Sequence, residues 1–406
     1  MATRQNRNIP QISNEYELGL IRLPASELIR RNRMEGSRLS LVHEVNGRHM
    51  VELNVSLKGN VTELNSASEQ QIRAAILLAG GSGKAADEGL VYGGGAVLNS
   101  TEGVVPRLYL TTAASEGFGR AMTTVKSQQI VLGVADEAAG FRVYNALRLI
   151  SPIALALSAS SPLTLDGNRI VNAGVDSIRM GQYAKGCARF PAEMWLDSPA
   201  LGSIADYNRA MATASQRFRE ALPDMDSRPE FQNMRNSTGV RFCEQQALEP
   251  HQVFWQVRPR PDHRNDRCAL SIEFRSPDIP FSIAEMQTIN RFVYGIACLA
   301  ASSDSQINLP SCLDGSFGQH LEAARRGLSA FVAGTGMRQL VNTVLSLSIE
   351  GLNRSGYSTE AVRLENGINR ILREGNGAQR LLRAVGNDLK QETVTNTCAR
   401  VLSSGW

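Results

Sequence analysis

Three distant segments alternate charged and apolar side chains, and this pattern constrains the fold more than any other feature. They read ISNEYELGL at 12–20, MVELNVSL at 50–57 and SIEFRSPDIPF at 271–281. Successive side chains of a β-strand point to opposite faces. As a strand, each segment therefore presents a row of charged groups on one face and packs its apolar side chains inward on the other.

The order of the expected elements indicates the fold class. Strands are expected at 15–23, 50–57, 128–134, 252–258 and 269–275. Helices are expected at 68–79, 138–159 with a break or kink at Pro152, 204–221, 282–301, 316–332, 336–350, 359–373 and 377–402. Residues 80–95 and 160–190 are expected to be loops, the second with some extended structure. Strands first and helices later, without regular alternation, predict an α+β fold with an antiparallel sheet.

Composition narrows the class of protein. The chain has 406 residues, enough for one large domain or two ordinary ones, and 42% of them are hydrophobic. A net charge of +4 is too small over this length to argue for a nucleic-acid partner. No apolar signal segment opens the chain, and its longest apolar run, within 153–159, is too short to span a membrane. We expect a cytoplasmic protein with no membrane partner.

Arginine dominates the basic residues, because only five of the 43 are lysines. Genome composition is one explanation of this bias. The other is a protein with several sites for carboxylate or phosphate, which arginine binds with two donors at once.

Other residue types that often carry chemistry lack the spacing that the chemistry needs. The segment AGGSGKAAD at 79–87 resembles a phosphate loop around Lys84, but Leu78 and Ala85 break the motif. The histidines have no metal-binding spacing, and they are His43, His49, His251, His263 and His320. The cysteines are expected to be free thiols, and they are Cys187, Cys243, Cys268, Cys298, Cys312 and Cys398.

Carboxylates are the candidate ligands for a cation. Glu15 and Glu17 share one face of their strand, and Glu52 and Glu273 alternate with apolar neighbours in theirs. Glu44 lies upstream of the second segment. If these strands are neighbours, the carboxylates converge, and a cation between them offsets their repulsion. The sequence predicts a polynuclear magnesium site whose ions clamp a nucleotide triphosphate, and the alternative is a solvated strand face.

Arginines are the candidate partners for phosphate. Arg258 and Arg260 lie two residues apart in VFWQVRPRPDHR at 253–264, and Arg275 follows Glu273 by two residues. These positions place cations beside the predicted magnesium site. The alternative for the 253–264 segment is a surface loop with solvated arginines.

These segments resemble known motifs. FWQVRPRPDHR followed by LSIEFRSPD closely resembles the W-D-[IV]-R-P-x-P … E-V-R-x-x-D segment of the glutamate–cysteine ligase and carboxylate–amine ligase family. Residues 15–17 resemble the family's E-x-E strand, and residues 51–54 resemble its V-E-[LIV] strand. Residues 156–162 resemble A-L-x-A-N-S-P, with Ser160 in place of Asn, and 321–330 resemble A-A-R-x-G-L-x-A. The resemblance runs in order from about residue 13 to about residue 330.

The resemblance implies a fold and a reaction. The fold is similar to the catalytic domain of glutamine synthetase, a curved antiparallel half-funnel sheet flanked by helices. The implied activity is ATP-dependent: a carboxylate attacks the γ-phosphate, and an amine then displaces phosphate from the acyl phosphate. The substrates implied are small amino acids and amines, with Mg²⁺ or Mn²⁺. We expect a catalytic domain at 1–350 and a helical extension at 351–406 packed on it, which allows a homodimer.

The resemblance also implies roles for individual residues. The implied metal ligands are Glu15, Glu17, Glu52, Glu273 and Gln129. The implied phosphate-binding residues are Arg258 and Arg275, with Arg260 a third. Arg179 is implied to bind the carboxylate of the substrate. Gln129 and Val131 stand where the family often has two histidines in H-V-H-V-G-V.

Two further interpretations stay open. One is a phosphotransferase on the same sheet, which phosphorylates a substrate without joining two. The other is a binding or scaffold protein that kept the fold and lost catalysis, which the missing histidines favour.

Overall fold

The computed structural model describes most of the chain, namely residues 9–36, 39–43, 49–80, 89–95, 125–166, 169–186, 197–221, 255–261, 269–302 and 307–405. Several residues discussed above lie outside these ranges: Glu44, Lys84, Cys187, Cys243, His251, His263 and Cys268.

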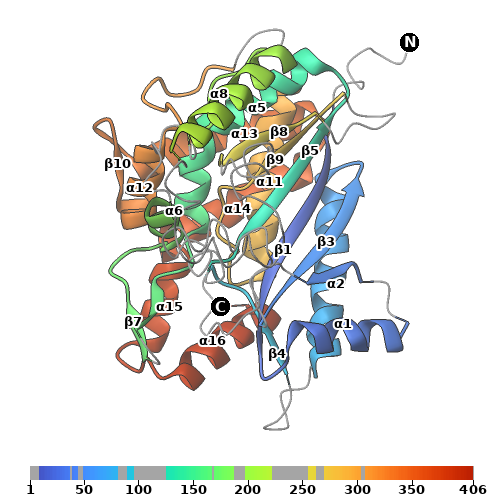
Figure 1. The fold of residues 1–406 in the computed structure, drawn as a ribbon, viewed down its shortest axis with the longest axis vertical. Coiled ribbons are helices and arrows are strands. Elements are labelled where there is room, and N and C mark those ends of the chain that lie inside the picture. Colours follow the sequence, from blue (N-terminus) through green and yellow to red (C-terminus); the bar gives the residue numbers. More distant parts are fainter. Residues whose placement is uncertain are drawn as a thin grey trace.

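A seven-stranded antiparallel sheet occupies the centre of the molecule (Figure 1). Its order is β2 (Leu41–His43), β3 (Met50–Lys58), β1 (Gln11–Ile21), β5 (Gln128–Val134), β9 (Leu270–Phe274) and β8 (Val257–Arg260), with β4 (Leu90–Tyr92) paired to the end of β1. Every pairing in this sheet is antiparallel. The predicted α+β class is therefore confirmed.

The alternation in β1 forms two different surfaces. Ile12, Tyr16 and Leu18 are fully buried, whereas Glu15 and Glu17 between them are only partly buried. The apolar face packs against helices, and the burial of its apolar surface stabilises the packing of the sheet on these helices. The charged side chains consequently lie on the opposite face.

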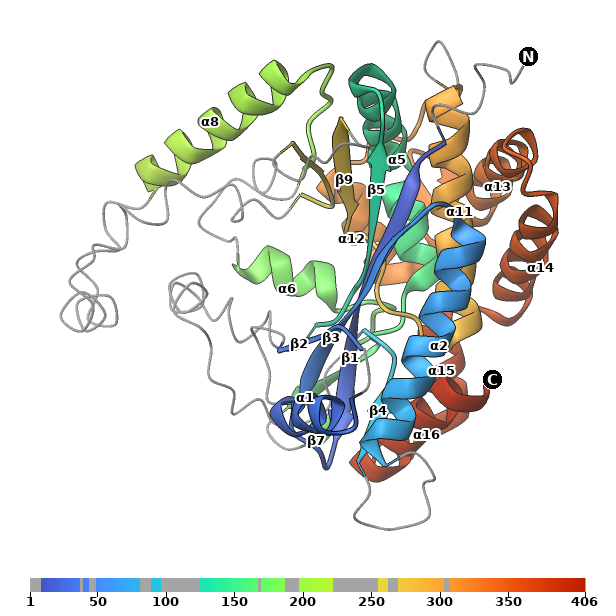
Figure 2. The same ribbon diagram turned by 90° about the vertical axis from the view of Figure 1, so that its right-hand side faces the viewer.

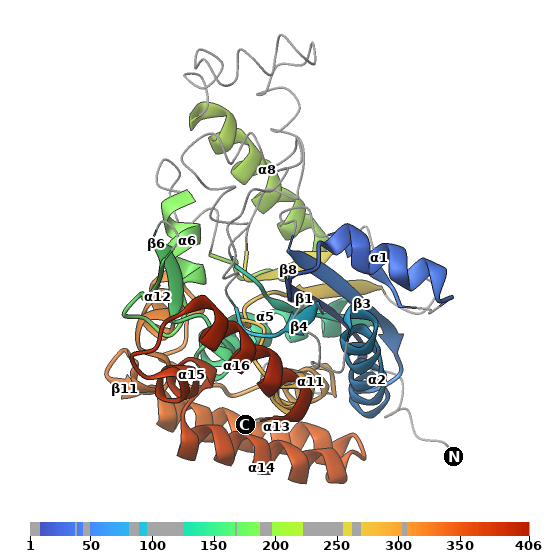
Figure 3. The same cartoon turned by 90° about the horizontal axis from the view of Figure 1, so that it is seen from below.

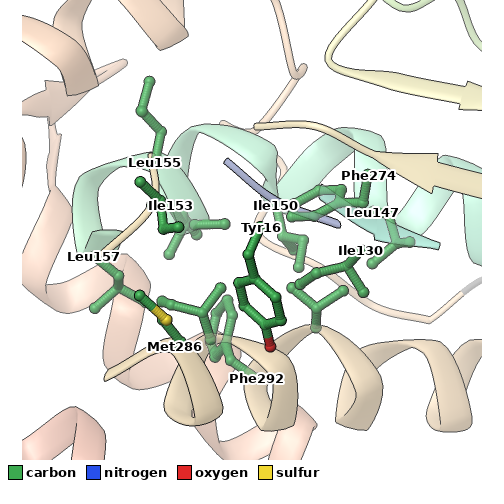
Figure 4. Close-up of a cluster of buried hydrophobic side chains, with 14 of the residues drawn as sticks. Tyr16, Ile130, Leu147, Ile150, Ile153, Leu155, Leu157, Phe274, Met286 and Phe292 are labelled. Atoms are coloured by element: carbon green, nitrogen blue, oxygen red, sulfur yellow. The ribbon is translucent and has the colours of Figure 1, made fainter. Parts of the chain in front are cut away.

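Two layers of helices cover the apolar face. The inner layer comprises α2 (Val61–Ala79), α5 (Glu137–Ser158) and α11 (Ile283–Ser302). The outer layer comprises α13 (Met337–Arg354) and α14 (Ser358–Glu374), as Figures 2 and 3 show. Between sheet and helices lies a core in which strand residues such as Tyr16, Ile130 and Phe274 meet Ile150 of α5 and Phe292 of α11 (Figure 4).

A buried polar network crosses this core and links β1 and β5 to the inner helices. Asn290 of α11 accepts hydrogen bonds from Asn14 Nδ2 at 2.8 Å and Gln128 Nε2 at 2.7 Å. Its own amide donates to Tyr16 Oη at 3.2 Å and to Asn65 Oδ1 of α2 at 2.9 Å. Buried polar groups are costly when unpaired, so this network favours one register of β1 against the helices.

The remaining elements surround this framework. They are α1 (Ala25–Met34), β6 (Leu163–Asp166), β7 (Arg169–Asn172), α6 (Arg179–Gly186), α8 (Ile204–Ala221), α12 (Phe317–Arg326), the 3₁₀ turn Gly327–Ser329, β10 (Phe331–Val332), β11 (Thr335–Gly336), α15 (Gly377–Val385) and α16 (Gln391–Ser404). Figure 2 shows α6 and α8 on the side of the sheet opposite to α2 and α11.

Several expected boundaries were wrong. Helix α5 is not broken at Pro152, and the expected kink stays a prediction. Proline has no N–H to donate to the carbonyl of Arg148, which instead accepts a hydrogen bond from Ser151 Oγ at 2.6 Å. The expected helix at 377–402 is two helices, because Gly386 adopts φ +53° and ends α15. Gly327, at φ +50°, likewise ends α12. The loop expected at 80–95 contains β4, and the loop expected at 160–190 contains α6 besides β6 and β7, which agree with the extended structure expected there.

Buried ion pairs fix the C-terminal helices to α11. Arg291 of α11 donates to Glu360 of α14 at 2.6 Å, and Arg380 of α15 pairs with Glu285 of α11. All four side chains are at least nine-tenths buried. The expected domain division at residue 350 stays a prediction, and α13 runs across that position.

Among the described helices, none combines the length and the apolar character that crossing a bilayer requires.

We predict that buried His320 makes the protein sensitive to mild acid. Burial lowers the pKa of His320 from 6.5 to about 4, and its ring contacts the carbonyl of Ser316 at 2.8 Å. Between these two pKa values the unfolded chain binds a proton at His320 and the folded chain does not. The contribution of His320 to the free energy of unfolding is therefore complete above pH 6.5 and is lost as the pH falls toward 4. Between pH 7 and pH 5 the loss is about 2 kcal/mol.

The measurement is urea unfolding of the wild type and a His320→Gln variant at both pH values. The variant should lose less stability on acidification, and equal losses in the two proteins would contradict the assignment.

Candidate active site

The register of the sheet places the predicted carboxylates in one row. Glu17 of β1 lies directly opposite Glu52 of β3. Glu15 lies between Asn54 of β3 and Gln129 of β5. Directly opposed residues of an antiparallel pair point to the same face, so these five side chains share the face that carries no core helices.

The same row continues through β9 and β8. Glu273 of β9 lies opposite Val131 of β5 on one side and Arg258 of β8 on the other. Arg275 follows Glu273 by two residues, and Arg260 follows Arg258 by two residues, so both share this face. Among the candidates that the structure describes, all except Arg179 thus lie on one sheet face.

Three guanidinium groups converge on a single carboxylate, that of Glu273. Arg258 Nη2 contacts Glu273 Oε2 at 2.7 Å, Arg260 Nη1 contacts the same oxygen at 2.8 Å, and Arg275 Nε lies 3.3 Å from Oε1. Burial acts to raise the pKa of Glu273, but the charges of Arg275, Arg258 and Arg260 outweigh it and hold the pKa at about 2. Glu273 is ionised, and the cluster retains an excess of positive charge.

The opposite end of the row is acidic. Burial, and then repulsion from Glu52, Glu273 and Glu17, raises the pKa of Glu15 to about 7. Burial also raises the pKa of Glu17, and the charge of Arg179 opposes this effect. Like charges held together in this way attract a cation.

Hydrogen bonds orient the acidic side chains. Glu17 accepts bonds from Ser127, through both its Oγ at 2.9 Å and its backbone N–H, and from Gln129 Nε2 at 3.1 Å. Glu52 Oε1 accepts a bond from Asn54 Nδ2 at 2.5 Å. Gln129 therefore supports a carboxylate through its amide nitrogen, and its role as a metal ligand stays a prediction.

Within the described residues, no group of three or more His, Cys, Asp or Glu side chains is arranged to hold a metal ion. Mg²⁺ in phosphate-transfer sites usually takes only one or two carboxylates, with waters and substrate phosphates as its other ligands. The paired carboxylates of β1 and β3 suit that manner of binding.

Arg179 is placed differently from the other candidates. It is the first residue of α6, its side chain is 1% exposed, and its guanidinium donates to backbone carbonyls just after β9. Its implied contact with a substrate carboxylate stays a prediction.

Lys126 at the acidic end was not predicted. Its ammonium is fully buried, lies 3.8 Å from the centre of the Tyr92 ring, and has a pKa that burial lowers to about 7. The space exists because residue 19 is glycine, whose missing Cβ would lie 2.8 Å from Lys126 Nζ. The available signal was Gly19, which continues the i, i+2 row of Glu15 and Glu17.

Two other features complete the surroundings of the site. Trp255 is buried and packs edge-to-face on Tyr207. Among the described cysteines, Cys298, Cys312 and Cys398 are free thiols.

Comparison with protein families identifies the chain. A model of glutamate–cysteine ligase family 2 matches residues 25–401. The chain belongs to this family of ligases. The resemblance seen in the sequence is thereby confirmed at the level of the family.

Solved ligase structures share the fold. The structure of glutamate–cysteine ligase from Francisella tularensis in complex with AMP matches with a TM-score of 0.62 and 10% identity, covering 98% of this chain and 89% of that one. A bifunctional glutathione synthetase from Pasteurella multocida matches with a TM-score of 0.57 and 13% identity, covering 98% of this chain and 52% of that one. The present chain thus spans about half of the length of the bifunctional enzyme. Among curated protein sequences, none matches the chain.

We predict that Glu273→Gln destabilises the protein by about 3 kcal/mol, because three buried or half-buried guanidinium groups then lack their counter-ion. Metal-free pyrophosphate should raise the melting temperature of this variant more than that of the wild type. The measurement is thermal unfolding with and without the anion.

The matched control is Glu69→Gln, which removes the exposed 2.9 Å contact with Arg73 and should change stability little. A Glu273→Gln variant as stable as the wild type at pH 7 would contradict the assigned charge balance.

Proposed function

We propose that this family member is an ATP-dependent ligase that joins a carboxylate to an amine through an acyl phosphate. The observation that carries the proposal is the separation of charge along one sheet face. Carboxylates of β1 and β3 lie at one end, arginines of β8 and β9 lie at the other, and β5 separates them. A magnesium–triphosphate group has the complementary distribution of charge.

The acidic end fits a divalent cation. Repulsion from Glu52 and Glu17 contributes to the raised pKa of Glu15, and a cation between these carboxylates relieves that repulsion. Glu15, Glu17 and Glu52 are the proposed ligands. When bound, Mg²⁺ or Mn²⁺ neutralises phosphate charge and orients the triphosphate. Glu273 and Gln129 are proposed as further oxygen ligands, and Glu273 must first release arginine contacts.

The basic end fits the phosphates. Arg258 contacts Glu273 through Nε and Nη2, Arg260 contacts it through Nη1, and Arg275 through Nε. Guanidinium donors of this kind also match phosphate oxygens. Arg260 is the most exposed of the three, at 19% of its side chain. Preorganised cations stabilise charge on the phosphoryl group during transfer with little reorganisation.

The proposed chemistry has two steps. A carboxylate oxygen of the first substrate forms a bond to the γ-phosphorus as the bond to the ADP oxygen breaks. A neutral amine nitrogen of the second substrate then attacks the acyl carbon, phosphate leaves, and the nitrogen releases a proton to give the amide. Glutamate or a related amino acid is the proposed first substrate.

We predict that ADP release from Mg²⁺-ATP requires both an amino acid and an amine. The measurement is ADP and phosphate release with glutamate and other amino acids, each crossed with a panel of amines, with and without EDTA. In a Glu15→Gln variant the rate should fall about 100-fold or more, because a cation ligand is lost. Its unfolding free energy should rise by about 1 kcal/mol, because a repelling charge is removed.

The control is Glu350→Gln, an exposed position on α13 paired with Arg354, which should keep the full rate. Release that needs one substrate alone would favour the phosphotransferase interpretation. Nucleotide binding without release across the whole panel would favour a binding protein, the interpretation that Gln129 and Val131 in place of two histidines supports.

A further inference from the structure

The chain just after β9 is held by the guanidinium group of Arg179. Arg179 Nη1 donates to the carbonyls of Ser276 at 2.7 Å and Pro277 at 3.3 Å, and its Nη2 donates to the carbonyl of Arg275. Its Nε donates to Tyr183 Oη at 3.0 Å. Every nitrogen of this buried group therefore has a partner within the protein.

A second buried charge lies at the end of the same segment. Asp278 is fully buried, and its Oδ2 accepts bonds from Ser161 Oγ at 2.7 Å and from the backbone N–H of Ser160 at 3.2 Å. Its Oδ1 accepts a bond from Ser177 Oγ at 3.0 Å. The charge of Arg179 favours the ionised form of Asp278 against the effect of burial.

These two charges join segments that are distant in the chain. Asp278 also pairs with Ser127 in a backbone bridge, and a Cβ on Gly95 would come within 2.9 Å of its carboxylate. The segment 275–278 is thus fixed against the start of β5, the 160–161 loop and the start of α6. Figure 2 shows α6 on the charged side of the sheet.

Arg275 is consequently held on both sides of its backbone. Its N–H donates to the carbonyl of Gln256 at 2.8 Å, and its carbonyl accepts the bond from Arg179. Its side chain then reaches Glu273, where Nε lies 3.3 Å from Oε1. A shift of the backbone at Arg275 would move its guanidinium relative to Arg258 and Arg260.

We propose that Arg179 is a positioning residue that, with Asp278, sets the guanidinium of Arg275 toward the nucleotide phosphates, and that it does not bind the substrate carboxylate. The inference rests on the proposed function, because it assigns Arg275 to the phosphates. It differs from the role that the sequence resemblance implies for Arg179. A lysine at position 179 keeps the charge, but it lacks the planar guanidinium group that donates to three carbonyls and a hydroxyl at once.

The two roles predict different kinetics. A ligand of the substrate carboxylate acts on the KM for that substrate and leaves nucleotide affinity unchanged. A residue that acts through Arg275 alters nucleotide affinity and kcat, and its effect disappears when Arg275 itself is changed.

The test is a double-mutant cycle on nucleotide binding. Isothermal titration measures the Kd of a magnesium complex of a non-hydrolysable ATP analogue for the wild type, Arg179→Lys, Arg275→Lys and the double variant. We expect each single change to weaken binding about 10-fold, and the double variant to bind no more weakly than the weaker single variant. With ATP, Arg179→Lys should lower kcat and leave the KM for the acid substrate within about twofold of the wild type.

The matched control is Arg142→Lys. Arg142 also donates to backbone carbonyls, those of Ala300 at 3.3 Å and Ala301 at 3.5 Å, but at the end of α11 away from the charged face. This variant should lose stability without a change in Kd. Asp278→Asn and the milder Ser177→Ala replace Arg179→Lys in the cycle if that variant does not fold.

Losses that add up to about 100-fold in the double variant would overturn the inference, as would a raised KM for the acid substrate with unchanged nucleotide affinity. Failure of the wild type to bind the analogue would instead overturn the proposed function, and the inference with it. Coupled losses in nucleotide affinity support both.

Discussion

The register of β1 is the constraint on which the rest of the structure depends. This strand pairs with β3, β4 and β5, and its two faces serve different purposes. Tyr16 and its apolar neighbours anchor the sheet on α2 and α11, while Glu15 and Glu17 face away from them. A slip of one residue would exchange these faces and bury the carboxylates in the core. The Asn14–Asn290 contact disfavours such a slip.

The charged face stores electrostatic repulsion at both ends. Repulsion from neighbouring carboxylates, added to burial, raises the pKa of Glu15 on β1, and three guanidinium groups share one carboxylate on β8 and β9. Neither arrangement maximises the stability of the isolated chain. Both are suited to a ligand that brings a cation and an anion together, and this match is the basis of the nucleotide-dependent ligase activity that we propose.

The C-terminal helices contribute to the same framework although no motif marks them. The Arg291–Glu360 and Glu285–Arg380 pairs tie α14 and α15 to α11, whose other face packs on the sheet. Asn376, which caps α15, also donates to Asp176 at 2.8 Å, three residues before the start of α6. The C-terminal region is therefore connected to the side of the molecule that carries Arg179.

The sequence by itself determined which residues share a face. The i, i+2 spacing of Glu15 with Glu17, and of Arg258 with Arg260, required nothing beyond the geometry of a strand, and the class of fold followed from the order of the elements. Most helices were also predicted, because their apolar spacing is local. Their ends at Gly327 and Gly386 were missed, since each depends on one glycine taking a positive φ.

Only the tertiary structure decided which strands are neighbours and what the charges contact. The position of β5 between β1 and β9 separates the acids from the arginines, and no local spacing encodes that order. The convergence of three arginines on Glu273, the burial of Lys126 over Gly19, and the contacts of Arg179 with the segment after β9 all join residues distant in the chain. Such contacts depend on the packing of whole elements, which the periodicity of any one segment does not specify.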